Sequence, residues 1–309
     1  MGGTATTGQT WVAIQRNPKS GSGTQRQMLV DLVRTLRALR LRPRVFKDRE
    51  RLQRRVHDPR WRDGLRCIVA AGGDGTVADV FNRFPGIPVA VLPMGTENLL
   101  ARHLGIPSSG ADVARLIAAD SRCRFDLGLV GNRRFALMVS AGFDAEVVRN
   151  THAAREGHIS HATYIQPILE SLRNYEHPPL RITVDEVLVP QTARLAVIVN
   201  IPAYALGLPV ARTARGDDGR LDLRLFEQGS AFQMIRYLCN LALGTHERLP
   251  DVISLTGSRL RIDSDVPVPL QADGDPIGFT PIEISVLPGA LEVFAPRSGE
   301  SRNPNDEGV

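Results

Sequence analysis

The sequence is poor in cysteine and aromatic residues, and it has no long apolar run. Its three cysteines, Cys67, Cys123 and Cys239, have no paired spacing, which excludes a disulfide framework and offers no zinc-binding pattern. Aromatic residues make up 5% of the 309 residues and do not alternate with the arginines, so we expect no nucleic-acid partner. The longest uncharged run, residues 195–211, has 17 residues and two prolines, which excludes a membrane-spanning helix there.

Lysine is also scarce, and arginine replaces it. The two lysines, Lys19 and Lys47, do not follow a glycine turn, which excludes a Walker A phosphate loop because that loop needs its lysine. Residues 16–66 contain 16 Arg and Lys against 5 Asp and Glu, a net charge of +11, whereas the whole chain carries +5. Such a segment is either a solvated helix surface or a face that attracts ATP or anionic lipid headgroups.

The two ends of the sequence have the composition of disordered segments. Residues 1–10 are rich in Gly and Thr, and residues 298–309 are rich in polar residues with Pro and Gly. Residues 1–10 also have neither the charged start nor the apolar core of a signal peptide. Together with the unpaired cysteines, this composition predicts a cytoplasmic protein.

The most informative stretch is residues 65–77. The apolar run Cys67–Ala71 suits a strand that is buried on both faces of a parallel sheet. It is followed by Gly72, Gly73 and Gly75, which allow a tight turn and close approach of another group. A strand, a glycine turn and a helix start present backbone N–H groups to an anion, although a plain βα turn is the alternative interpretation.

Two polar residues within this turn refine the interpretation. Thr76 is expected to cap a helix that begins at Val77. Asp74 would repel phosphate groups unless a metal ion or a protonated partner joined it, so its presence favours a nucleotide bound with Mg²⁺.

Two further strand-to-helix turns precede and follow this one. Residues 11–15 form a plausible strand that leads into a small-residue turn containing Asn17 and Ser20. Residues 87–92 form another, which ends in Pro93-Met94-Gly95-Thr96-Glu97-Asn98. Repeated βα units predict a doubly wound parallel sheet with its ligand beyond the carboxyl ends of the strands.

The pattern changes near residue 134, where alternating β-rich runs predict an antiparallel sandwich. We therefore expect an α/β domain over residues 11–133, a sandwich over 134–286, and a strand at 287–297 that could return to the first domain.

A helical run at 230–243 places one apolar stripe mostly on one side: Phe232, Ile235, Leu238, Cys239 and Leu241. Such a stripe is usually core, but it could also border an acyl-chain entrance and contact a membrane.

Acidic residues in the second half gather at two turns. In Asp273-Gly274-Asp275, mutual repulsion of the two carboxylates would raise one pKa toward that of a useful base, and the alternative is an Asp-Gly hairpin turn. Residues 217–222, D-D-G-R-L-D, are by themselves most typical of a hairpin turn. The seven histidines show no ligand spacing, so we expect them at the surface.

The order of these motifs resembles the catalytic domain of the diacylglycerol kinase and sphingosine kinase superfamily, the bacterial lipid kinases in particular. The resemblance covers about residues 11–296. The motifs that carry it are Asn17-Pro18 with Ser20-Gly21, Gly72 to Thr76, Leu92-Pro93 with Gly95-Thr96 and Asn98, Ala101-Arg102 with Leu104 to Pro107, Asp126-Leu127-Gly128, Gly142-Phe143-Asp144, Asp217 to Asp222, and Asp273-Gly274-Asp275.

This resemblance implies an α/β nucleotide-binding domain followed by a β-sandwich, with ATP and Mg²⁺ between them. By motif match, the residues implied to hold ATP are Asn17, Ser20, Gly72, Gly73, Asp74, Gly75, Thr76, Gly95, Thr96 and Asn98. Asp218 would bind a structural Mg²⁺ together with the main chain around it, to which Arg215 and Arg220 belong. Asp273 or Asp275 would be the catalytic base, and family members usually carry glutamate at the second position.

The chain departs from the family pattern at three places. Phe46 and Lys47 stand where family members use a threonine to contact ATP. Leu99 and Ser22 occupy the positions of an aspartate and a lysine that some members connect to the aspartate matched by Asp126. Because acid and base are absent together, no unpartnered buried charge remains. The neighbouring Glu97 is either a replacement ligand or an exposed acid at a helix N-terminus.

Three functions are compatible with this sequence. The first is an ATP- and Mg²⁺-dependent lipid kinase, acting on diacylglycerol or a related glycerolipid or sphingoid lipid, with peripheral membrane contact. The second is a kinase like the NAD kinases, which share the Gly-Gly-Asp-Gly-Thr turn. The third is a non-catalytic regulator that binds nucleotide or anionic lipid. A homodimer is compatible with each of them.

Overall fold

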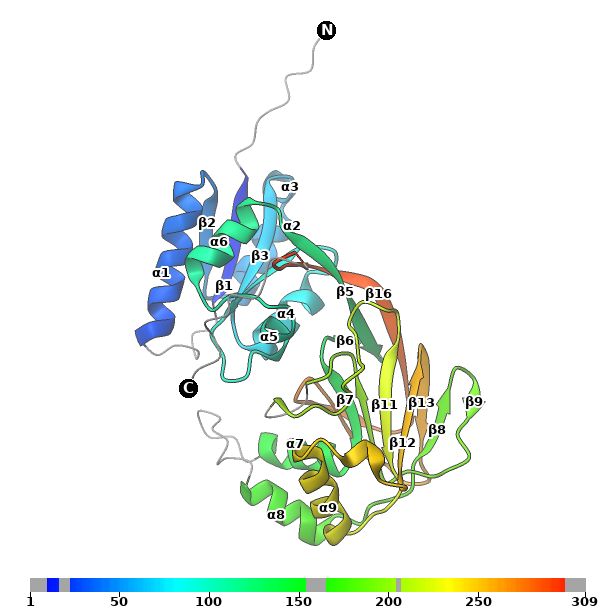
Figure 1. Ribbon diagram of the computed structural model, residues 1–309. Coiled ribbons are helices and arrows are strands. Elements are labelled where there is room, and N and C mark those ends of the chain that lie inside the picture. The colour runs from blue at the N-terminus through cyan, green and yellow to red at the C-terminus, as the bar shows by residue number, and fades with distance from the viewer. Residues whose placement is uncertain (1–9, 17–22, 154–164, 204–206, 298–309) are drawn as a thin grey trace. The chain divides into compact units, whose positions relative to one another are not determined.

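The computed structural model describes residues 10–16, 23–153, 165–203 and 207–297 (Figure 1). The chain divides into two compact units. The first unit comprises the residues up to Phe125 and those from Ala290 onward, and the second unit runs from Asp126 to Gly289. The expected disordered ends, residues 1–9 and 298–309, lie outside the described residues.

A parallel sheet forms the centre of the first unit. Its strands are β1 (Trp11–Arg16), β2 (Arg42–Phe46), β3 (Leu65–Gly72), β4 (Val89–Pro93) and the end of β16 (Ile282–Phe294). Their order is β2-β1-β3-β4-β16, and each neighbouring pair is parallel. Strand β4 and most of β3 are buried and apolar, as strands covered on both faces must be.

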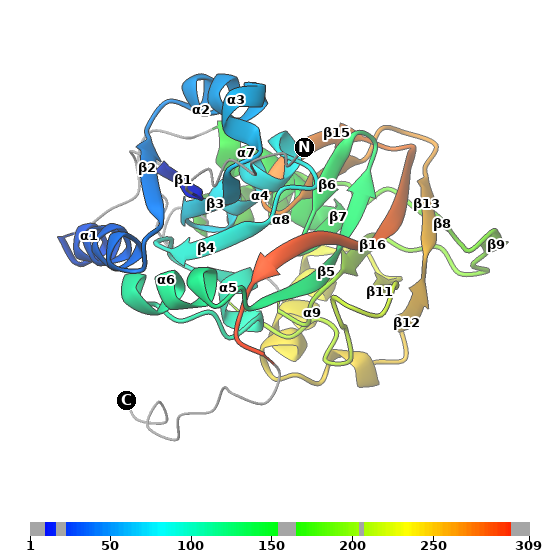
Figure 2. The same ribbon diagram turned by 90° about the horizontal axis from the view of Figure 1, so that it is seen from above.

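Helices cover both faces of this sheet. They are α1 (Gly23–Ala38), α2 (Arg49–His57), α3 (Pro59–Arg62), α4 (Asp74–Arg83), α5 (Leu99–His103) and α6 (Gly110–Ala118). Figure 2 shows α1 and α6 on one face, with α2 and α3 on the other. The first unit is therefore the doubly wound α/β domain that the repeated βα units predicted.

Helix α4 begins earlier than the sequence suggested. Its first residue is Asp74 and its N-cap is Gly73, so the expectation that Thr76 caps a helix starting at Val77 was wrong. The N–H groups of Thr76 and Val77 both donate to the Gly73 carbonyl oxygen, over 2.8 and 3.2 Å. Because Gly73 has no side chain, its carbonyl oxygen is the acceptor of both bonds, and the helix begins directly after its backbone.

The second unit contains a six-stranded sheet of order β12-β11-β10-β7-β14-β15, in which every pairing is antiparallel. The strands are β7 (Met138–Gly142), β10 (Leu195–Val199), β11 (Leu221–Phe226), β12 (Val252–Gly257), β14 (Pro269–Ala272) and β15 (Asp275–Phe279). The remaining strands are β5 (Arg122–Val130, which starts in the first unit), β6 (Arg133–Phe135), β8 (Arg181–Val184), β9 (Val187–Leu188), β13 (Arg259–Asp263) and the first part of β16.

One apolar core joins these strands. It contains Ile198 and Leu223 from the six-stranded sheet together with Ile182 and Ile262 from β8 and β13. All four side chains are at least 99% buried. This arrangement confirms the antiparallel β domain that the alternating runs predicted.

The second unit also holds helices: α7 (Phe143–Ala153), α8 (Ile165–Asn174), α9 (Ala231–Ala242) and the 3₁₀ turn η3 (His246–Arg248). The sequence predicted α9 but not α7 or α8. Within the described ranges, no helix is long and apolar enough to cross a membrane. The three cysteines are free thiols, as their spacing indicated.

Candidate active site

Two strand-to-helix turns of the first unit touch through glycine. The turns are β3–α4 and β4–α5, and a Cβ atom built on Gly95 would lie 2.4 Å from the Cα atom of Gly73. No side-chain carbon fits at that distance, so the contact requires glycine at position 95. The Met94 N–H also donates to the Gly72 carbonyl oxygen over 2.9 Å. The structure thus brings together Gly72, Gly73 and Gly95 at the carboxyl ends of β3 and β4.

Packing does not explain why a glycine stands at position 75. A Cβ atom at Gly72 would come within 2.2 Å of Thr76 Oγ1, whereas a Cβ atom at Gly75 meets nothing within 4 Å among the described residues. Gly75 is also exposed and lies in the first turn of α4. A glycine with free space above it at a helix N-terminus leaves room for a group to approach the backbone N–H groups there.

Asp74 is bound by backbone N–H groups of the neighbouring helix. Its carboxylate accepts hydrogen bonds from Leu99 N, over 3.0 Å, and from Leu100 N, over 3.2 Å, at the start of α5. Burial raises the pKa of the Asp74 carboxyl group, and the two backbone bonds act in the opposite direction. The Asp74 carboxylate therefore caps the N-terminus of α5. This role accounts for an acidic residue in the turn without a bound metal ion. Its role toward a nucleotide stays a prediction.

Asn98 closes the turn that carries Thr96. Its Oδ1 atom accepts a bond from Gly95 N over 2.9 Å, and its Nδ2 atom donates to Gly95 O over 2.8 Å. Asn98 itself has a left-handed backbone with φ of 49°, which asparagine tolerates better than most residues. Thr96 is exposed within this closed turn. Asn17 and Ser20, the other predicted ATP contacts, lie outside the described residues.

In the second unit, Asp273 binds three consecutive backbone N–H groups. Its carboxylate accepts from Ala136 N over 2.8 Å, from Leu137 N over 2.9 Å and from Met138 N over 3.0 Å. Its own N–H donates to the Met138 carbonyl oxygen over 3.0 Å. Asp273 therefore fixes the Asp-Gly-Asp turn against the strand next to it.

Asp275 lies at the other end of the same turn. Its side chain is 41% exposed, and one carboxylate oxygen accepts from the Arg133 guanidinium. The other oxygen lies 3.5 Å from His152 Nε2. The same nitrogen lies 3.1 Å from the Gly274 carbonyl oxygen. Asp275 thus lies between an arginine and a histidine, and its carboxylate is partly exposed to solvent.

A buried polar network holds the turn from the side of α7. Gly274 N donates to Gln271 Oε1 over 2.9 Å, and Gln271 Nε2 donates to Ser140 Oγ and Asp144 Oδ2 over 2.9 and 3.0 Å. Ser140 also donates to Asp144. Burial raises the pKa of the Asp144 carboxyl group. These contacts give a structural role to Asp144 of the Gly142-Phe143-Asp144 motif.

The acidic loop before β11 has the geometry of a turn. Asp218 Oδ1 accepts from Arg220 N over 3.0 Å, and Arg215 pairs with Asp217 over 3.2 Å. Asp218 is exposed, which leaves its second oxygen accessible. No group of three or more His, Cys, Asp or Glu residues is placed to hold a metal ion in the described part of the chain. A cation bound here would therefore depend on main-chain oxygens and water in addition to Asp218.

Asp126 anchors this loop. Its carboxylate accepts from Gly219 N over 2.7 Å and from Gly289 N over 2.6 Å. Its own N–H donates to the Gly216 carbonyl oxygen over 2.7 Å. The side chain is 4% exposed, so these bonds satisfy a buried charge. The lysine and aspartate that accompany this residue in some relatives are not needed to satisfy it here.

The expectation that the histidines lie at the surface was wrong for two of them. His177 and His246 are buried, whereas His152 is partly exposed and lies next to Asp275. His246 Nε2 lies 2.7 Å from the Val210 carbonyl oxygen. Sequence spacing could not reveal these roles, because each partner is distant along the chain and is brought near only by the fold.

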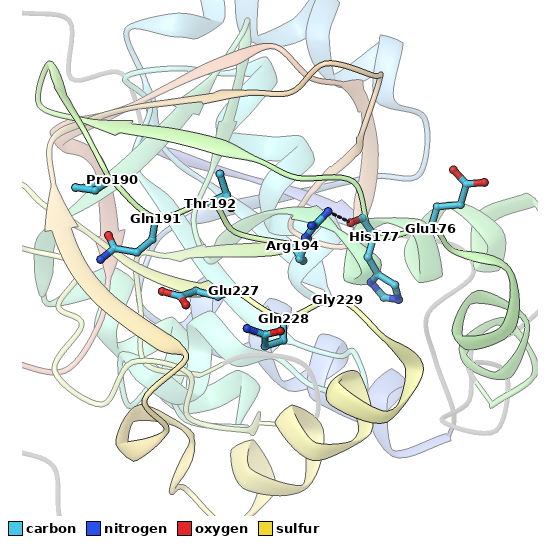
Figure 3. Close-up of a pocket in the computed structure, with 9 residues that line it drawn as sticks. All are labelled: Glu176, His177, Pro190, Gln191, Thr192, Arg194, Glu227, Gln228 and Gly229. Atoms are coloured by element: carbon cyan, nitrogen blue, oxygen red, sulfur yellow. Dashed lines mark hydrogen bonds between the residues drawn. The ribbon is translucent and has the colours of Figure 1, made fainter.

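An open pocket of about 700 Å³ lies in the second unit, away from the predicted residues (Figure 3). It is lined by Glu176, His177, Pro190, Gln191, Thr192, Arg194, Glu227, Gln228 and Gly229. The Arg194 guanidinium donates to the His177 carbonyl oxygen over 2.9 Å (Figure 3). Burial, followed by the charge of Arg194, lowers the pKa of the His177 imidazole. No predicted catalytic or nucleotide-binding residue lines this pocket.

Two family models match the chain. The diacylglycerol kinase catalytic domain matches residues 12–130, and the YegS C-terminal NAD kinase beta sandwich-like domain matches residues 137–295. A similar solved structure, of a diacylglycerol kinase from Bacillus anthracis, superimposes with a TM-score of 0.68 at 19% identity. That superposition covers 94% of this chain and 97% of the other, and it supports the fold.

Curated relatives are similar over most of the chain. A diacylglycerol kinase of Mycobacterium tuberculosis is 29% identical over 247 residues, which cover 76% of this chain and 79% of the relative. An uncharacterized protein of Synechocystis is 28% identical over 241 residues, and the alignment spans 56% of its length. A lipid kinase YegS-like protein of Chromohalobacter salexigens is 25% identical over 249 residues, which cover 75% of this chain and 77% of the relative.

Proposed function

The chain belongs to the diacylglycerol kinase superfamily, and on that basis we propose that it is an ATP- and Mg²⁺-dependent lipid kinase. The proposed substrate is diacylglycerol or a related glycerolipid or sphingoid lipid, whose hydroxyl group receives the γ-phosphoryl group. The observation that carries the proposal is the Asp-Gly-Asp turn, in which three backbone bonds fix Asp273 while Asp275 remains accessible. A relative named diacylglycerol kinase supports the lipid class.

In this proposal the glycine turns of the first unit hold the nucleotide phosphates. Gly75 leaves space above the first turn of α4, whose N–H groups suit an anion. Asn98 keeps the neighbouring turn closed, which positions Thr96 at the surface. These groups would bind and orient the triphosphate, and phosphoryl transfer depends mainly on such positioning and on charge stabilisation.

Asp275 is the proposed general base. It would accept the proton of the lipid hydroxyl as the oxygen attacks the phosphorus atom, while ADP leaves. Asp273 is unsuitable, because three N–H groups already occupy its oxygens. Arg133 and His152 lie on either side of Asp275 and would hold its orientation. Asp273 is therefore a positioning residue.

We infer two roles for magnesium ions. Bound with the nucleotide, Mg²⁺ would neutralise charge on the transferring phosphoryl group. A second, structural ion would be held by the free oxygen of Asp218 and by main-chain oxygens around Arg215 and Arg220. Such an ion would brace the loop that Asp126 already anchors from the inside.

The test is a phosphorylation assay with radiolabelled ATP and purified protein. Diacylglycerol, monoacylglycerol, sphingosine, phosphatidylglycerol and NAD are offered separately, so that lipid and NAD kinases are distinguished. We expect a labelled lipid, and we expect Asp275→Asn to lower kcat by about 100-fold or more. The matched control is Asp265→Asn, which alters an exposed aspartate paired with Arg181 and should leave kcat unchanged.

Gly75→Ala separates nucleotide binding from stability. The space around Gly75 accepts a methyl group, and alanine favours a helix, so the protein should be at least as stable as wild type. We expect the KM for ATP to rise because the methyl group occupies the approach to the N–H groups. Labelling of NAD but of no lipid, or full lipid kinase activity of Asp275→Asn, would contradict the proposal.

A further inference from the structure

Helix α9 exposes its apolar stripe to solvent. The sequence pattern was most typical of a core stripe, but of its five residues only Leu241 is buried. Phe232 is 73% exposed, Ile235 is 48% exposed and Leu238 is 39% exposed, and Leu243 directly after the helix is 75% exposed. The helix packs into its unit through Met234, Tyr237 and Leu241, and Leu241 belongs to the predicted stripe. It therefore has two apolar faces, and one of them is uncovered.

The uncovered residues form one continuous face. With about 100° of rotation per residue, residues 232, 235, 238, 239, 242 and 243 fall within an arc of roughly 140°. All six are uncharged, and all six are exposed. The polar residues Gln233, Arg236 and Asn240 lie together on a separate strip beside this arc. The exposed apolar residues of the arc are therefore contiguous. Single scattered apolar residues at a surface need no explanation, but a contiguous apolar face does.

Helix α9 and the adjoining turn η3 together carry two arginines and one glutamate. Helix α9 contains no acidic residue, and its one charged residue, Arg236, pairs with Asp251 over 2.7 Å. The nearby Glu247 in η3 pairs with Arg224 over 2.6 Å. Asp251 therefore has its own arginine, whereas Arg224 is shared between Glu247 and Asp222, which lies 3.6 Å from it.

Two exposed arginines lie close to the end of α9. The Arg212 guanidinium lies against Gly244, since a Cβ atom built there would come within 2.1 Å of Arg212 Nη2. Arg248 is exposed in η3, which contacts α9. An apolar arc with cations at one end matches the interface of a bilayer that contains anionic headgroups.

We propose that the exposed arc of α9, residues 232–243, inserts into the surface of a lipid bilayer, with Arg212 and Arg248 against anionic headgroups. This inference deepens the proposed lipid kinase function, because a lipid substrate lies in a bilayer. It can nevertheless be tested without ATP and without any kinase substrate, so that its failure and the failure of the kinase proposal are distinguishable.

The experiment is flotation of the full chain with vesicles of phosphatidylcholine and phosphatidylglycerol that contain no diacylglycerol. We expect Phe232→Ser to weaken vesicle binding roughly tenfold, because a large apolar side chain no longer enters the interface. Leu243→Ser should have a similar effect. Replacing both Arg212 and Arg248 by alanine should weaken binding to vesicles with phosphatidylglycerol but not to pure phosphatidylcholine vesicles.

The matched control is Leu188→Ser, which removes an equally large exposed side chain from the β8–β9 hairpin. It should bind vesicles as wild type does. Equal binding by Phe232→Ser, Leu188→Ser and wild type would overturn the proposal. So would light scattering that shows a dimer dissociated by Phe232→Ser together with unchanged vesicle binding, because a second copy of the chain would then be the occupant.

Discussion

Replacing Asp273 by alanine should destabilise the second unit severely. The carboxylate accepts bonds from three consecutive N–H groups, of Ala136, Leu137 and Met138, all in buried residues. An N–H group that loses its partner in a buried place costs about 1–3 kcal/mol. Asp273 also has a left-handed backbone, with φ of 48°, where alanine is disfavoured by about 1 kcal/mol. We therefore expect the free energy of unfolding to fall by about 4 kcal/mol or more.

Urea unfolding followed by circular dichroism measures this change. Asp273→Asn is the informative comparison, because asparagine tolerates the left-handed backbone and its carbonyl oxygen can still accept from Leu137 N and Met138 N. Its amide group would face Ala136 N, so we expect a loss of about 1–2 kcal/mol.

The two positions of the turn should also respond differently. Asp275→Asn should leave stability within about 0.5 kcal/mol of wild type, because the Asp275 side chain is 41% exposed and its ion pair with Arg133 is solvated. If Asp273→Ala lost less than about 1 kcal/mol, or if Asp275→Asn lost more than Asp273→Asn, the assignment of structural and catalytic roles would be refuted.

Three further predictions concern other contacts. Gly95→Ala should lower the free energy of unfolding by about 2–3 kcal/mol in urea titrations, because its Cβ atom would overlap Gly73, whereas Gly75→Ala should not lower it. The pKa of His177 is lowered in the folded state, so stability from this group should be lost as pH falls below about 6.5, where only the unfolded state gains a proton. His177→Phe should therefore reduce the dependence of the unfolding free energy on pH by up to about 1.4 kcal/mol per pH unit. An unchanged pH dependence would contradict the assignment. His152→Ala should lower kcat of the proposed lipid kinase reaction about tenfold, whereas His152→Gln, which retains a donor for the Gly274 carbonyl oxygen, should lower it less. Equal effects of the two substitutions would argue against a positioning role.

The first unit could be predicted largely from the sequence because its signals are local. Strand β3 is an apolar run that ends in glycine, and the spacing of Val77, Val80 and Phe81 marks the buried face of α4. The start of α4 was misplaced by three residues, since the backbone of Gly73 rather than the hydroxyl of Thr76 begins the helix. Local patterns identify an element more reliably than its end.

The second unit was predicted less completely. Helix α7 was missed because its residues, FDAEVVRNTHA, mix apolar and polar positions without a clear helical period. The exposed stripe of α9 has the same sequence pattern whether solvent, protein or lipid covers it. A periodic pattern shows that an apolar face exists, but only the fold shows what lies against it.

The roles of individual acidic residues were the hardest to predict, because their partners are distant along the chain. Asp74, Asp126 and Asp273 all lie in the motifs that carried the resemblance, but each carboxylate is bound by backbone N–H groups from elsewhere in the chain. Sequence reasoning assigned Asp74 and Asp273 to chemistry because an acid in a glycine turn suggests it. The structure shows that these acids also connect the turns to neighbouring elements.

The position of strand β16 in the sheet affects how the first unit folds during translation. The sheet of the first unit has β4 next to β16, whose pairing residues are Val293 and Phe294. When a ribosome has synthesised only residues 1–125, that edge of β4 still lacks its neighbour, and an open strand edge invites association with other chains. The sheet of the first unit therefore becomes complete last, after the whole β domain has been made, and nascent chains released before residue 293 should be prone to aggregate.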